Sequence, residues 1–139
     1  MKRITQTLLL LLVLVASVSS CKKKEDAVVA PAVAIIGKWK LVSIALTVAG
    51  QTVNQPLEDC QKDDILEFFT SPKATLTNGA LKCDPADLAV QNSTYSLSAD
   101  GKTLTIDGEV QTVTELSSST MKLQQSGFGL SALATFTKI

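Results

Sequence analysis

Short stretches in which apolar and polar residues alternate recur from Ile35 to the end of the chain. Residues 103–106 are Thr-Leu-Thr-Ile and residues 121–124 are Met-Lys-Leu-Gln, so each stretch has one apolar and one polar face when it is extended. Asp-Gly pairs at 100–101 and 107–108 lie between such stretches and favour the positive φ angles of tight hairpin turns. The pattern predicts antiparallel strands rather than a helical domain.

Several segments of the chain show this strand pattern or a mostly apolar variant of it. They are residues 39–46, 65–70, 73–78, 94–98, 102–107, 109–115, 120–125 and 131–138. The spacing predicts an all-β fold of about eight short strands, in which an antiparallel up-and-down meander either closes into a barrel or stacks as a sandwich. Closure removes unpaired strand edges and therefore favours the barrel. Helical periodicity is weak, and residues 84–90 are the best short helical candidate.

The first twenty residues have the three regions of a secretory signal peptide. Lys2 and Arg3 are a positive start, residues 8–16 are an unbroken apolar run, and residues 17–20 are mostly small. The apolar run is short for a membrane-spanning helix, which is the alternative interpretation. We therefore expect residues 1–20 to be a signal peptide and the protein to be exported.

Val18-Ser19-Ser20-Cys21 resembles the lipobox of bacterial lipoproteins, in which a small residue precedes a cysteine. The resemblance implies that Cys21 receives the lipid, that the signal is cut before it, and that the acyl chains anchor the protein in a membrane. Two or three acyl chains give stable anchoring, whereas one gives marginal binding. The alternative is an ordinary secreted protein with a free thiol near its start, which is a liability in an oxidising compartment.

Residues 21–34 contain the lipidated cysteine and a stretch of charge, alanine and valine without a folding pattern, and we expect them to be a flexible tether. Lys24-Glu25-Asp26 resembles the short acidic signal that sends some lipoproteins to the cell surface. The alternative for these residues is a solvated charge run near anionic headgroups. The expected location is the outer membrane, at its periplasmic face or at the cell surface.

The chain has three cysteines, an odd number for an exported protein. Assigning Cys21 to the lipid leaves Cys60 and Cys83 as a pair, which we expect to form a disulfide. A metal site is the alternative, but the chain has no histidine to complete one. The sequence thus predicts neither a metal nor a cofactor.

Charge and residue types argue against two function classes. Loss of residues 1–20 removes Lys2 and Arg3, so the 13 basic residues fall to 11 against 13 acidic ones, and a body slightly negative overall has no basic face for nucleic acid. Without histidine, and with two cysteines expected to be oxidised, the usual general bases and nucleophiles are missing. The acids at 63, 64 and 67 and at 84 and 87 are expected to be solvated. We therefore expect no enzymatic activity.

Gly37-Lys38-Trp39 is a G-x-W sequence on the first expected strand. Together with the cysteine-containing segment from Cys60 to Cys83, "YSLSADGKTLTIDG", "VTELSSSTMKLQ" and the closing "ATFTKI", it resembles the lipocalin-like domain of small bacterial envelope lipoproteins. The resemblance implies that residues 35–139 form a barrel, with Trp39 closing one end and Gly37 allowing close backbone approach. The family's arginine over the tryptophan is missing, and Lys138 is expected in its place through a cation–π contact.

The resemblance implies a cavity that binds a small apolar or amphipathic molecule. The candidate wall residues lie on the apolar faces of the expected strands: Leu41, Leu66, Phe68, Leu76, Tyr95, Leu97, Leu104, Ile106, Met121, Leu123 and Phe136. In a body this small, many of them are needed for the core itself. The alternative function is therefore a non-catalytic envelope scaffold or protein-interaction module with a filled barrel. The residues do not indicate an oligomeric state.

Overall fold

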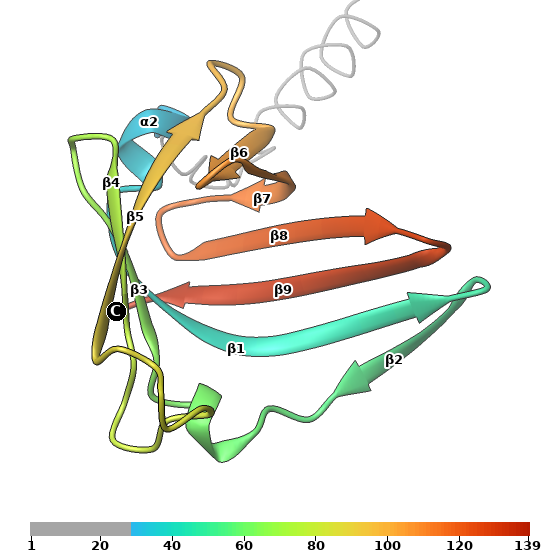
Figure 1. Cartoon of the computed structure of the whole chain (residues 1–139). Helices are drawn as coiled ribbons and strands as arrows, with labels where there is room; N and C mark the ends of the chain where they lie inside the picture. Colours follow the sequence, from blue (N-terminus) through green and yellow to red (C-terminus); the bar gives the residue numbers. More distant parts are fainter. Residues whose placement is uncertain (1–28) are drawn as a thin grey trace, which may run out of the picture.

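The computed structural model describes residues 29–139, and its strands form one antiparallel sheet that closes on itself (Figure 1). The strands of the closed part are β1 (Gly37–Val48), β3 (Ile65–Phe68), β4 (Lys73–Thr77), β5 (Val90–Leu97), β6 (Thr103–Ile106), β7 (Glu109–Leu116), β8 (Thr120–Gly127) and β9 (Leu130–Lys138). Each pairs with the next along the chain, and β1 also pairs with β9 from Trp39↔Lys138 to Val48↔Leu130. The predicted up-and-down barrel is confirmed.

One further strand, β2 (Gln51–Gln55), was not expected from the sequence. β1 is long enough to pair with β3 through residues 37–40 and with β2 through residues 44–48. A β-bulge interrupts the β1–β9 register between Leu41 and Ser43, and bulges bend the strand that contains them. Beyond it, the ends of β1, β2, β8 and β9 project from the barrel, away from the helix α2 (Figure 1). We call this projection, residues 44–55 and 124–133, the arm.

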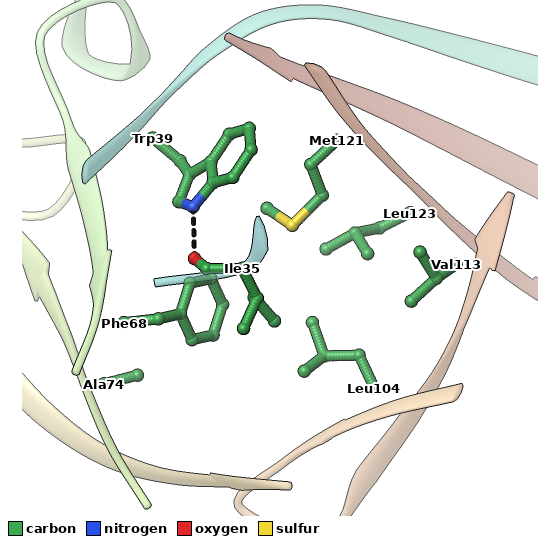
Figure 2. Packing of buried hydrophobic residues seen from close by; sticks show 8 residues of the cluster. All are labelled: Ile35, Trp39, Phe68, Ala74, Leu104, Val113, Met121 and Leu123. Atoms are coloured by element: carbon green, nitrogen blue, oxygen red, sulfur yellow. Dashed lines mark hydrogen bonds between the residues drawn. The ribbon is translucent and has the colours of Figure 1, made fainter. Parts of the chain in front are cut away.

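The barrel core is a cluster of side chains from most of its strands (Figure 2). Its buried members are Ile35, Trp39, Phe68, Ala74, Leu104, Val113, Met121 and Leu123. Each fully buried large side chain of this kind contributes about 1.5–3 kcal/mol relative to exposure. This cluster is the main source of barrel stability, and it fills the part of the interior next to Trp39.

The folded body begins earlier than the expected boundary at residue 35. Pro31–Ala34 form a short helix, α2, and Ala34 is buried. Proline at the first helical turn is favourable because its missing N–H needs no partner there. Pro31 lies against Gly101, where any added Cβ would come within 2.6 Å of the proline ring. Pro31 and Ala34, within the last four residues of the expected tether, therefore pack on the barrel, whereas Val33 between them is exposed.

Residues 84–90, the best helical candidate, form a turn rather than a helix. The carboxylate of Asp84 accepts a hydrogen bond from the Ala86 amide over 2.8 Å, and the carboxylate of Asp87 accepts one from the Asp84 amide over 3.2 Å. Aspartate side chains that bond nearby amides compete with helical hydrogen bonding. Within residues 29–139, no helix is long and apolar enough to span a membrane.

Candidate ligand-binding site

Trp39 closes one end of the barrel and is fully buried. Its indole N–H donates to the carbonyl oxygen of Ile35 over 2.7 Å (Figure 2). The ammonium of Lys138 lies 5.0 Å from the centre of the indole ring and donates to the carbonyl oxygen of Ala34 over 2.8 Å. Lys138 therefore makes the contact expected in place of the family's arginine, and it also fixes the last residue of α2.

Gly37 lies directly beneath this closure, at a φ of 120°. A Cβ at this position would lie 2.9 Å from the Lys138 side chain. Glycine is required here both because other residues rarely adopt this φ and because the lysine passes so close. Gly37, Trp39 and Lys138 thus form one packed unit, as the G-x-W pattern predicts.

Trp39 also lines a partly open cavity of about 340 Å³ in the barrel. Its apolar lining comes from Trp39, Leu41, Leu66, Leu76, Ile106 and Phe136. Pockets that hold small molecules begin at about 300 Å³, so this cavity suits a small ligand. The lining is mainly apolar, which is the chemistry that a hydrocarbon or ring system needs.

The candidate wall residues separate into three groups. Leu41, Leu66, Leu76, Ile106 and Phe136 line the cavity. Phe68, Leu104, Met121 and Leu123 belong to the buried core instead. Tyr95 and Leu97 pack against the core and line a second hollow near α2. The alternation of apolar residues identifies inward-facing positions, but the sequence does not reveal how far along the barrel the core extends.

The cavity lining also includes polar residues that the sequence analysis did not select: Gln61, Asp64, Gln91 and Ser93. We call this polar part of the lining the mouth. Gln91 and Ser93 have the same strand parity as Tyr95 and Leu97, and that parity could have identified them. Asp64 accepts a hydrogen bond from the Gly79 amide over 2.9 Å, which fixes its position. Residues 58–64 contain four acids and one lysine, so the rim is acidic. Such a rim favours a neutral or cationic polar group over an anion.

A disulfide joins Cys60 to Cys83 with a Cα–Cα distance of 5.2 Å, and this prediction is confirmed. Cys60 lies in the 3₁₀ helix η1 (Asp59–Gln61), so the bond ties this part of the mouth to the loop before β5. Glu58 lies close to both sulfurs in an arrangement that could hold a metal. Because the sulfurs are bonded to each other, they are not available as thiolate ligands in this state.

The second hollow is a more open groove of about 660 Å³ between α2, the β3–β4 turn and β5. Tyr95 lies in it, stacks edge-on against Phe68 and donates its hydroxyl to the carbonyl oxygen of Phe69 over 2.6 Å. Burial raises the pKa of Tyr95 above its usual value. We favour the interior cavity as the ligand site because strands from around the barrel contribute its apolar wall and polar side chains adjoin that wall.

The carboxylates whose pKa values shift lie in turns rather than in the cavity. The Thr94 amide, which donates to Asp107 over 2.7 Å, lowers the pKa of that carboxyl, and the Ser98 hydroxyl does the same for Asp100. Lys62 lowers the pKa of Asp59 through an exposed ion pair. Hydrogen bonds and an ion pair at the surface explain these pKa shifts, and the three carboxylates do not form an acid–base pair.

Comparison with known proteins places the barrel in a family. A model described as "Lipocalin-like domain" matches residues 35–123. The chain belongs to the lipocalin-like domain family. In this lipocalin-like chain the matched residues run from the start of the core to β8 and include the G-x-W sequence and both bonded cysteines. No curated protein matches.

Among solved structures, the lipocalin-like chain is similar to a lipocalin-like protein from Bacteroides uniformis ATCC 8492. The two share 19% identity over 76% of this chain and 99% of the other, with a TM-score of 0.49. Cys21 and residues 1–20 lie outside the described residues, so the lipid site and the signal peptide remain predictions.

Proposed function

We propose that this lipocalin-like protein is an exported, lipid-anchored outer-membrane lipoprotein that binds a small apolar or amphipathic molecule in its barrel. The observation that supports binding most directly is the apolar cavity between Trp39 and a polar mouth. The lipobox-like sequence before Cys21 supports the anchor. The proposal includes no catalysis, no metal, no cofactor and no nucleic acid.

The lining suggests how the ligand lies. An apolar portion would contact Leu41, Leu66 and Phe136, because burying apolar surface there is favourable. A polar end would face Gln61 and Gln91 at the mouth, where amide groups can donate and accept hydrogen bonds. The acidic rim adds a preference for a neutral or cationic end.

A neutral naphthylamine probe tests the binding proposal, measured by its fluorescence with residues 22–139. We expect enhanced, saturable fluorescence with the unmodified chain and its loss in Leu76→Trp, which fills the cavity. Gln91→Trp narrows the mouth without touching the buried core and provides a second test. Leu88→Trp, at an exposed loop residue, is the matched control. Probe fluorescence that is unchanged by both Leu76→Trp and Gln91→Trp would support the filled-barrel interaction module instead.

Fatty-acid labelling tests the anchor. A radioactive fatty acid should label the full chain in cells, and Cys21→Ala should abolish the label because no other residue offers the lipid site. Cys60→Ser/Cys83→Ser is the control that removes cysteines without removing the anchor. Persistent labelling of Cys21→Ala would refute the lipid assignment while leaving the cavity proposal intact.

A further inference from the structure

The arm lies in the largest uncharged part of the folded body. Residues 41–57 and 123–137, which include the whole arm, contain no aspartate, glutamate, lysine or arginine. By contrast, the rim segment 58–64 alone has five charged residues. Charges keep exposed sheet surfaces soluble and block unwanted edge pairing. Their absence from a projecting element requires a physical explanation.

The two hairpin turns at the end of the arm are also uncharged. Ala49-Gly50 joins β1 to β2, and Phe128-Gly129 joins β8 to β9, with positive φ at all four residues. The register pair Val48↔Leu130 brings these turns side by side. Such turns favour asparagine or aspartate before glycine, and the barrel uses Asp107-Gly108 for the same φ pattern. At the end of the arm, Ala49 and Phe128 occupy the positions where asparagine or aspartate would favour both the positive φ and solvent exposure.

The strand registers place most of the arm's hydroxyl side chains on one face and most of its large apolar side chains on the other, which also carries Gln51, Gln55 and Gln125. On the polar face the side chains bond one another: Thr47 to Thr52 over 2.9 Å, and Ser131 to Gln124 over 2.8 Å. On the other face Leu46 pairs with Val53, and the exposed Val48 pairs with the exposed Leu130. This face continues along β1 and β9 from the cavity-wall residues Leu41 and Phe136. Val48, Val53 and Leu130 on this face are exposed, whereas Leu46 is half-buried.

The geometry points to the lipid bilayer surface as the partner of the arm: we propose that Phe128 and the two adjoining turns enter the interfacial region of the membrane. Aromatic side chains are enriched at the bilayer interface, and charged ones become costly where a surface reaches the acyl chains, which fits the uncharged composition of the arm and Phe128 at its end. Phe128 is fully exposed in the structure, and it is the large apolar side chain nearest the end.

The edge of the arm limits how deep it can enter. β2 pairs only with β1 among the described strands, so part of its backbone has no partner on the outer side. Unpaired backbone groups do not occur facing hydrocarbon. The turns therefore enter the headgroup region and the start of the acyl chains, while the rest of β2 stays in water. This contact is separate from the lipid on Cys21 and does not depend on a ligand in the cavity.

Tryptophan fluorescence of the full chain in phosphatidylcholine vesicles tests the proposal. Phe128→Trp places a reporter at the end of the arm, and Val110→Trp places a matched reporter on an exposed strand residue of the barrel. The spectrum of the unmodified chain supplies the signal of buried Trp39, which is subtracted. For Phe128→Trp we expect a blue shift on vesicle addition and loss of about half or more of its emission with brominated lipids, as for an interfacial tryptophan.

Val110→Trp should show neither change, even though the same N-terminal segment is present in both variants. Emission from position 128 that brominated lipids do not quench more than emission from position 110 would overturn the proposal. A blue shift that rises with protein concentration and is insensitive to bromine would also overturn it, and would identify a second copy as the partner. Loss of labelling at Cys21 would leave this test unaffected.

Discussion

At the scale of a single residue, Lys138 links Trp39 on β1 to the end of α2. Its ammonium contacts the Trp39 ring and bonds the Ala34 carbonyl, which comes 104 residues earlier in the chain. Lysine over tryptophan contributes less geometric specificity than arginine, because arginine is planar and stacks. The family's arginine is thus replaced by a residue that keeps the charge and the position, and the hydrogen bond to Ala34 fixes it there.

Lys138→Met should lower the free energy of unfolding by about 2 kcal/mol, since the cation–π contact and a charge-assisted hydrogen bond are lost together. Urea denaturation measures the change. Lys122→Met, which breaks the exposed ion pair with Glu115, should cost less than about 1 kcal/mol. Lys138→Arg should keep most of the stability. Equal losses for the two methionine variants would contradict the role assigned to Lys138.

Asp107 gives the barrel a defined dependence on pH. The bond from the Thr94 amide lowers its pKa in the folded state below the unfolded value of 3.8, so the carboxylate stabilises the fold above that pH and loses this effect as pH falls through the folded pKa. The stability difference between the unmodified chain and Asp107→Ala should therefore be larger at pH 7 than at pH 2. Urea midpoints at both values test this, and a difference independent of pH would refute it.

At the scale of elements, the structure differs from the sequence prediction where the formation of a strand depends on its pairing partner. Residues 103–106 alternate cleanly and form β6 as expected, whereas Gln51–Gln55 have one apolar residue and form β2 only because β1 extends beyond β3. The mouth residue Gln91 was missed because a polar residue at an inward position resembles one on an outward face. Local pattern identifies strands and their faces, but the length of a neighbouring strand and the limit of the core are tertiary properties.

The bond between Cys60 and Cys83 connects η1 to the loop before β5 and so fixes the mouth. Their sequence separation of 23 predicts a loss of about 3 kcal/mol in Cys60→Ser/Cys83→Ser by the chain-entropy estimate. The same variant should bind the naphthylamine probe more weakly, because the mouth loses its connection. Thermal unfolding and probe titration measure both effects. Full affinity in the double variant would show that the mouth holds its shape without the bond.

At the scale of the whole molecule, one barrel presents three different surfaces. Trp39 is buried at one end, polar side chains including Asp64 line the cavity beside it, and the arm has no charged residue. The arm projects from the barrel, away from α2 (Figure 1). An anchor at Cys21 would hold this body close to a bilayer, and the arm would add a second contact that restricts its orientation. The apolar face of the arm leads toward the cavity wall, so a molecule leaving the bilayer would meet apolar surface along that path.

Native mass spectrometry tests ligand binding, the central claim of this account, most directly. The protein would be purified from its native membranes in mild detergent, with Gln91→Trp prepared in the same way as the control. We predict a reproducible additional mass of a small molecule on the unmodified chain, and its loss in Gln91→Trp with the lipid mass retained. A polypeptide that bears only its anchor in both preparations would contradict ligand binding and favour the filled-barrel interaction module.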